Sequence, residues 1–156
     1  MTETHQPEIV TLEPRAAAVL RETVRMEALP DFFGRAFGSA LQVAGSQGVM
    51  VVGPPFGAYF GMPGDTVDVA AGFPTERPVD SDAGVQPLAL PGGRAVQLLH
   101  VGSYDALQEA YGRLMAWMGA EGLTGGSLMW EEYLTEPDPE HPENTQTLIV
   151  WPLAED

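Results

Sequence analysis

The sequence predicts an α+β domain in which duplicated strand-helix-strand-strand units form an antiparallel sheet with two helices and a cleft between pseudo-symmetric halves. Three observations lead to this prediction. Two segments carry apolar residues at helical spacing. Short apolar or alternating segments bounded by glycine and proline indicate strands. Similar residues also recur in one order about 78 positions apart, which indicates an internal repeat.

The chain of 156 residues suits a single domain with an apolar core. We expect this domain to cover residues 11–153, with halves at about 11–74 and 88–153. Residues 1–10 are polar and are expected to form a tail. Residues 75–87 are polar, with prolines and acids, and are expected to connect the halves.

In the first half, apolar spacing predicts a helix over residues 29–44. Pro30 suits its first turn, where a missing N–H costs nothing, and Gly45 suits its end. A turn is expected at residues 63–65. The strands of this half are expected at residues 15–24, 49–52, 56–62 and 66–73.

In the second half, the same spacing predicts a helix over residues 104–119. Asp105 near its start suits the positive end of the helix dipole. An acidic loop with three prolines is expected at residues 135–144, before the last strand. The strands of this half are expected at residues 94–101, 128–134 and 145–151.

The repeat consists of four matches in one order, at separations of 74 to 79 residues. The matching segments are 15–16 with 94–95, 31–37 with 109–115, 59–60 with 133–134 and 73–74 with 151–152. At the separation of 74, Glu131 corresponds to Gly57 and Glu132 to Ala58. Repeated units usually pack about a pseudo-twofold axis, and the seam between them is a natural place for a cleft.

Composition excludes several classes of function. The chain has 22 acidic and 7 basic residues and a net charge of -15, which argues against sequence-independent nucleic-acid binding because phosphate contacts need cations. It has no cysteine, so disulfides and thiol catalysis are excluded. No spacing of acids and histidines suggests a metal site, and no cofactor is expected. A cytoplasmic protein without a membrane partner is the simplest interpretation, since neither a signal core nor a membrane-length apolar run is present.

The most informative segment is the apolar run at residues 128–134, because it contains two glutamates. In a strand, Met129, Glu131 and Tyr133 point to one face and Glu132 to the other. A buried carboxylate needs a partner or supplies one to a ligand. The alternative is an edge strand with both glutamates in water.

Five motifs follow one another along the chain. They are Gly-Pro-Pro-Phe-Gly-Ala-Tyr at 53–59, Asp-Val-Ala-Ala-Gly-Phe-Pro at 68–74, His-Val-Gly-Ser-Tyr-Asp at 100–105, Trp-Glu-Glu-Tyr-Leu-Thr-Glu-Pro at 130–137 and a last strand at 147–152. Their order and spacing resemble the GyrI-like family of small-molecule-binding domains, which includes effector-binding domains of MerR- and AraC-type regulators. The resemblance covers nearly all of residues 11–153.

The resemblance implies a duplicated strand-helix-strand-strand fold that binds lipophilic, often cationic molecules between its halves. The family's pocket glutamate, in the pattern Glu-x-Tyr, falls on Glu131 and Tyr133. Aromatic and thioether side chains are expected to surround the ligand. The expected ligand-binding residues are Phe56, Tyr59, Met62, Tyr104, Met129, Glu131, Tyr133 and Trp151.

Two features depart from the family's pattern. The family-like region begins near residue 11, which leaves no room for a helix-turn-helix, so a stand-alone domain without direct nucleic-acid contact is expected. The position after the pocket glutamate is often apolar in the family, but it is Glu132 here. Glu132 is therefore either solvated on an outer face or a second acid of the pocket, and we take Glu131 as the inward residue.

Three functions follow from this interpretation. The first is binding of lipophilic, aromatic or cationic small molecules for sequestration or detoxification. The second is hydrolysis of strained, cyclopropane-type rings of genotoxic natural products, known for some GyrI-like proteins, with Glu131 as general base and Tyr133 stabilising an oxyanion. The third is a protein-interaction module acting on DNA gyrase, which predicts a closed seam. An exposed sheet edge could also pair with a second copy in a homodimer.

Overall fold

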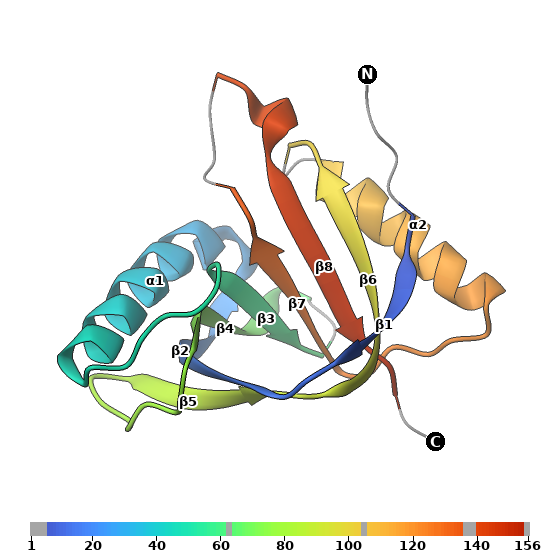
Figure 1. Ribbon diagram of the computed structural model, residues 1–156. Coiled ribbons are helices and arrows are strands. Elements are labelled where there is room, and N and C mark those ends of the chain that lie inside the picture. Colours follow the sequence, from blue (N-terminus) through green and yellow to red (C-terminus); the bar gives the residue numbers. More distant parts are fainter. Residues whose placement is uncertain (1–5, 62–63, 104–105, 136–139, 155–156) are drawn as a thin grey trace.

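The computed structural model describes residues 6–61, 64–103, 106–135 and 140–154. They form one curled, antiparallel sheet of eight strands with two long helices, which confirms the predicted fold class (Figure 1). The elements in chain order are β1 (Glu8–Leu12), β2 (Arg15–Arg25), the 3-10 turn η1 (Met26–Ala28), α1 (Leu29–Ser46), β3 (Phe56–Phe60), β4 (Thr66–Thr75), β5 (Val85–Leu90), β6 (Gly93–Val101), α2 (Leu107–Ala120), β7 (Leu128–Tyr133), the 3-10 turn η3 (Pro142–Asn144) and β8 (Gln146–Pro152).

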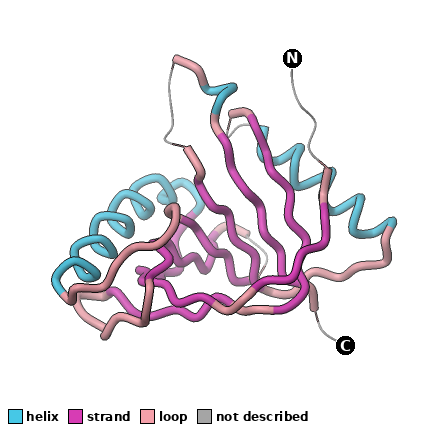
Figure 2. The backbone as a smooth tube through the Cα atoms, viewed as in Figure 1, coloured by secondary structure: helices cyan, strands magenta, loops and turns pink. Residues whose placement is uncertain are grey.

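The strand order shows how the two halves join. It runs β1-β6-β8-β7-β3-β4-β2-β5, so β2, β3 and β4 are contiguous, as are β6, β7 and β8. The seam between these groups is the antiparallel pair β3–β7. The two outer strands are exchanged: β1 pairs with β6, and β5 pairs with β2 (Figure 2). Each half therefore extends the sheet of the other.

The two outer strands, β1 and β5, were not predicted from the sequence. β1 falls partly in the expected tail, and β5 begins in the expected connector. Val10 and Leu12 of β1 pack against the core, but a strand of five residues gives only a weak alternating signal. In β5, Pro87 argues against a strand, yet proline is tolerated at a sheet edge because its missing N–H breaks no ladder there.

The expected strand at residues 49–52 is wrong. Only an isolated bridge between Val51 and Thr75 is present, and the Val52 N–H donates to the Pro74 carbonyl. Gly53 is followed by two prolines, which have no N–H to continue a ladder. The segment therefore crosses to β3 as an irregular connection.

Both helices lie on one face of the sheet. α1 packs on β2 and β4 through residues such as Phe32 and Ala36, and α2 packs on β6 and β8 through Leu114 and Met118. Neither helix covers β3 or β7 completely, because each packs on the strands of its own half. The seam strands are thus left accessible between the helices.

The opposite face of the sheet closes on itself as the sheet curls. Phe56, Ala58 and Trp130 are fully buried there, together with Leu90 from the exchanged strand β5. Burying aromatic side chains of this size stabilises the fold by about 2–3 kcal/mol each. This core holds β3 and β7 in register from behind, which fixes the side chains that they present to the helix side.

We expect Gly72→Ala to destabilise the protein by about 2–3 kcal/mol. Gly72 lies in β4, and a Cβ atom there would come 1.8 Å from the Ala18 carbonyl oxygen of β2, so the backbone itself must move. Gly38→Ala, in α1, is the matched control: nothing lies within 4 Å of its Cβ, and we expect a gain of about 0.5–1 kcal/mol. Urea denaturation measures both, and a Gly72→Ala variant as stable as the wild type would contradict the close strand packing.

Candidate functional site

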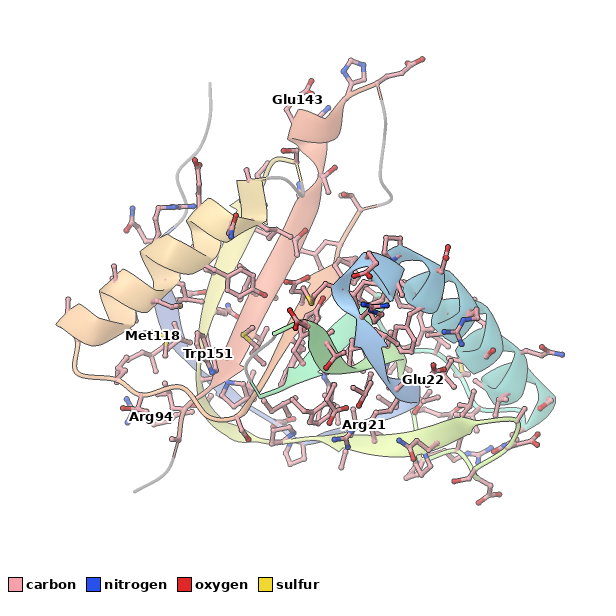
Figure 3. The ribbon with its side chains drawn as sticks, turned by 180° about the vertical axis from the view of Figure 1, so that it is seen from behind. Arg21, Glu22, Arg94, Met118, Glu143 and Trp151 are labelled. Carbon is pink, nitrogen blue, oxygen red and sulfur yellow. The ribbon has the colours of Figure 1, made fainter. Side chains whose placement is uncertain are left out.

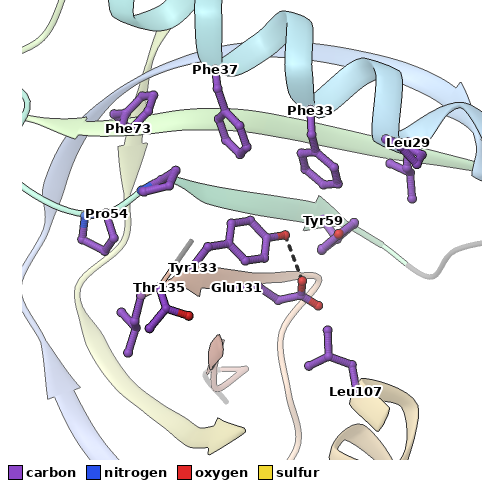
Figure 4. Close-up of a pocket in the computed structure, with 13 residues that line it drawn as sticks. Leu29, Phe33, Phe37, Pro54, Tyr59, Phe73, Leu107, Glu131, Tyr133 and Thr135 are labelled. Carbon is purple, nitrogen blue, oxygen red and sulfur yellow. Dashed lines mark hydrogen bonds between the residues drawn. The ribbon is translucent and has the colours of Figure 1, made fainter. Parts of the chain in front are cut away.

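A cavity of about 850 Å³ lies over the seam, between the two helices (Figure 4). Its lining is mostly apolar, and α1 and the segment before β3 supply much of it. The lining residues are Leu29, Pro30, Phe33, Phe37, Pro54, Pro55, Tyr59, Phe73, Leu107, Glu131, Tyr133, Leu134 and Thr135. Four of these carry polar side chains, and Glu131 is the one acid among them.

Glu131 is held at the floor of this cavity by two phenols. It is only 6% exposed. The Tyr133 hydroxyl donates a hydrogen bond of 3.0 Å to Oε1, and the Tyr111 hydroxyl of α2 donates to Oε2. Each carboxylate oxygen therefore has one donor, which offsets part of the cost of removing the acid from water.

The surroundings shift the protonation of all these groups. Burial raises the pKa of Glu131 above its ordinary value of 4.5, while the hydrogen bonds from Tyr111 and Tyr133 and a smaller electrostatic contribution from His100 lower it in part. Burial and the nearby carboxylate raise the pKa of both tyrosines and of Tyr59. The phenols therefore stay protonated and remain donors.

The site is built from equivalent positions of the two halves. Gly57 and Glu131 correspond in the repeat, and they pair directly across the seam. A Cβ atom on Gly57 would lie 2.8 Å from the Phe33 ring and 3.0 Å from the Tyr133 hydroxyl. Because Gly57 has no side chain, the first half leaves space at the seam, and the Tyr133 phenol of the second half lies in that space. The further equivalent pairs around the axis are Leu29 with Leu107, Phe33 with Tyr111 and Tyr59 with Tyr133.

Rings from α1 and the sheet form one wall of the cavity. Phe33 and Phe37 are stacked, with centroids 5.8 Å apart and an interplanar angle of 18°. The Tyr133 ring meets both edge-on, at 6.1 and 6.4 Å, and Phe37 meets Phe73 edge-on at 5.7 Å. Such a wall offers flat aromatic contact and electron-rich faces for a cation.

The structure brings together three of the residues expected to bind a ligand: Tyr59, Glu131 and Tyr133. Met129 is half-buried on the same face of β7 but outside the cavity lining. Met62 and Tyr104 lie outside the described residues.

Phe56 and Trp151, which we also expected at the cleft, lie elsewhere. Phe56 precedes Gly57 on β3, so it points to the opposite face, where it packs with Trp130. Trp151 packs beside Met118 under α2 (Figure 3) and donates from Nε1 to the Gly126 carbonyl at 2.9 Å. Both aromatic residues serve the core.

The helices contribute residues to the site that were not predicted from the sequence. Phe33 and Phe37 are four residues apart on α1, and their spacing was used only to predict the helix. Tyr111, a phenol on the apolar face of α2, offered a signal, since the repeat aligns it with Phe33. Thr135, two residues after Tyr133 in the same motif, was not singled out.

Glu132 and His100 have structural partners instead. Glu132 lies on the far face of β7, where Oε2 accepts hydrogen bonds from Trp130 Nε1 at 3.1 Å and Arg15 Nη2 at 3.3 Å. The cavity therefore holds one glutamate. His100 is buried on β6, and its Nε2–H donates to the Ser103 carbonyl at 2.9 Å.

Among the described residues, no group of three or more acidic or histidine side chains is placed to hold a metal ion. In the same part of the chain, every helix is too short or too polar to cross a membrane.

Comparison by sequence identifies one family. Residues 5–154 match the GyrI-like small molecule binding domain. No curated protein matches the chain.

Solved structures with the same fold include regulators, a hydrolase and a ligand complex. The EcmrR C-terminal domain has a TM-score of 0.82 at 17% identity, over 97% of this chain and 99% of that chain. In the cryo-EM structure of an EcmrR–DNA complex the TM-score is also 0.82 at 17% identity, over 98% of this chain but 59% of that one, so this chain spans little more than half of that protein.

Two further structures have a TM-score of 0.68. A hydrolase from Listeria innocua is 16% identical over 97% of this chain and 93% of that chain. SAV2435 bound to tetraphenylphosphonium is 12% identical over 96% of this chain and 94% of that chain. At these identities the likeness shows the fold alone.

We expect Glu131→Gln to become more stable relative to the wild type as the pH rises above about 4.5. The folded wild type keeps a proton on Glu131 at pH values where the unfolded chain has lost it, so wild-type stability falls as the pH rises through this window. Glutamine carries no such proton. Glu121→Gln, an exposed acid of the same half, controls for the loss of one negative charge. A difference in unfolding free energy that does not change with pH, measured by urea denaturation from pH 4 to 8, would contradict the burial of this acid.

Proposed function

This chain belongs to the GyrI-like small-molecule-binding domain family, as its motifs predicted, and from this premise we propose that the seam cavity binds lipophilic aromatic cations. One observation carries the proposal. Glu131 is buried beneath an apolar, ring-lined cavity, and its hydrogen-bond donors are neutral phenols. A ligand cation would supply the positive charge that these donors lack.

The size and composition of the cavity suit such ligands. A volume of about 850 Å³ is in the range of small-molecule sites. A delocalised cation with aromatic substituents loses little hydration on entering it and gains contact with Phe33, Phe37 and Tyr133. The net charge of -15 also attracts cations to the protein from solution.

Sequestration of toxic cations is the role that we attach to this site. SAV2435, which shares the fold, is bound to tetraphenylphosphonium, and this supports a cation of the same class as the first probe. An interaction module acting on DNA gyrase would need no cavity, and for such a module we expected a closed seam. The open seam favours a ligand instead.

We expect tetraphenylphosphonium to bind with an affinity that Glu131→Gln lowers by about tenfold or more, because the ion pair forms in a cavity of low dielectric. Affinity in the wild type should also rise with pH through the pKa of Glu131, since the cation pairs with the ionised form. Calorimetry in buffers of different ionisation enthalpy measures both the affinity and the proton released.

Glu132→Gln is the matched control for this experiment. It removes the same charge from the adjacent residue, but on the far face of β7, where Arg15 and Trp130 are its partners. It should leave the affinity within about twofold of the wild type. Equal losses in the two variants would show that only the overall charge matters, and the proposed site would be wrong.

Hydrolysis of a strained ring is the second candidate, and the raised pKa of Glu131 favours it. The carboxylate would accept a proton from a water molecule that attacks a ring carbon, and a phenol would stabilise the oxyanion formed as the ring opens. Against this, the Tyr133 hydroxyl already donates to Glu131, as does that of Tyr111. Binding without turnover therefore fits the hydrogen bonding better.

We expect a tenfold excess of a cyclopropane-containing DNA alkylator to give no more ring-opened product than one equivalent of protein. Mass spectrometry of the supernatant and of the intact protein measures product and adduct. Many turnovers that Glu131→Gln abolishes and Glu132→Gln preserves would establish the hydrolase instead.

A further inference from the structure

Thr135 carries a polar group at the part of the cavity that Glu131 does not reach. It is the second residue after the end of β7, lines the cavity and is half-buried. Figure 4 shows it on the far side of the Tyr133 ring from Glu131, with its hydroxyl oxygen drawn. Glu131, Tyr133 and Thr135 all line the cavity, and the Leu134 N–H continues the pairing with β8 past the end of β7, so the three residues follow one line along the cavity.

The hydrogen bonding of Thr135 fixes the position of its oxygen and leaves its proton available. The Gln146 N–H donates to Thr135 Oγ1 at 3.0 Å, and the Leu134 N–H donates to the Gln146 carbonyl at 3.1 Å. These two bonds tie the residue to the start of β8. The hydroxyl proton has no acceptor among the described residues, and a hydroxyl can donate while its oxygen accepts.

The other polar side chains of the lining are already engaged. Tyr133 donates to Glu131, and Tyr59 interacts with Tyr133. The remaining lining is apolar, apart from Thr135. The cavity therefore has two separate polar points, an acid network and a hydroxyl donor, with apolar surface between them.

We infer that the cavity selects cations that also carry a hydrogen-bond acceptor, such as a carbonyl or ether oxygen, which Thr135 recognises. This inference rests on the proposed function and narrows its ligand class. The four residues of chain from Glu131 to Thr135 span at most about 14 Å between Cα atoms. The acceptor is therefore expected on the order of 10 Å from the cationic centre, so the ligand is elongated rather than spherical.

The test uses two triphenylphosphonium cations that differ in one group. Each carries an arm that reaches on the order of 10 Å, ending in a methyl ketone in one probe and in the isosteric C=CH₂ group in the other. The quantity measured is the ratio of the two dissociation constants, alkene over ketone, in each protein. We expect Thr135→Val to lower this ratio about three- to tenfold relative to the wild type, and Thr135→Ser to preserve it.

Tetraphenylphosphonium, which has no acceptor, separates this inference from the proposed function. Thr135→Val should change the affinity for tetraphenylphosphonium by the same factor as that for the alkene probe, and measurable binding also shows that the variant is folded. An unchanged alkene-to-ketone ratio in Thr135→Val would overturn the role of Thr135 and leave the proposed function standing. A wild type that fails to bind tetraphenylphosphonium would count against both.

If Thr135→Val does not fold, the inference is tested by varying the arm length of the ketone and alkene probes with the wild-type protein. Its preference for the ketone should be greatest at one arm length and disappear when the arm is shortened by about half. A preference that does not depend on arm length would overturn the inference, because a fixed donor can serve only one distance.

Discussion

The pairing of Gly57 with Glu131 across the β3–β7 seam is the constraint on which the cavity depends. Equivalent residues of the two halves face each other across the antiparallel seam at the pseudo-twofold axis. Their side chains therefore share one limited space. Two glutamates would place like charges together in an apolar site, and two glycines would leave no charge. A glycine facing a glutamate gives one buried acid and room for the Phe33 and Tyr133 rings beside it.

The same symmetry explains why the seam is open. Each helix packs on the outer and middle strands of its own half, and the exchanged strands β1 and β5 extend the sheet away from the axis. The core that stabilises β3 and β7 lies behind them, around Phe56 and Trp130. The helix side of the seam can therefore stay accessible without loss of the packing that holds it. The equivalent positions Phe33 and Tyr111 have different roles: the Phe33 ring packs against Tyr133, and the Tyr111 hydroxyl donates a hydrogen bond to Glu131.

The sequence predicted what depends on local pattern and on the repeat: the two helices, the six inner strands and the side of β7 on which Glu131 lies. It did not predict β1 and β5, because their exchange depends on tertiary pairing and because Pro87 in β5 is unusual in a strand. Phe56 and Trp151 were placed in the cleft by residue type alone, whereas strand alternation decides the face for Phe56. Phe37 enters the site because α1 packs beside a seam formed by strands far away in the chain, which periodicity does not encode.

Glu131 and Glu132 show how one strand gives neighbouring acids different chemistry. Glu132 meets the guanidinium of Arg15, so its charge is balanced within the protein. Glu131 meets only the neutral hydroxyls of tyrosines at its two oxygens. Neutral donors satisfy lone pairs but leave the net charge, and burial makes that charge costly. In the function that we propose, a ligand cation offsets the free energy lost in burying this acid, and it does so on one face of β7 because the acid on the other face is already paired with Arg15.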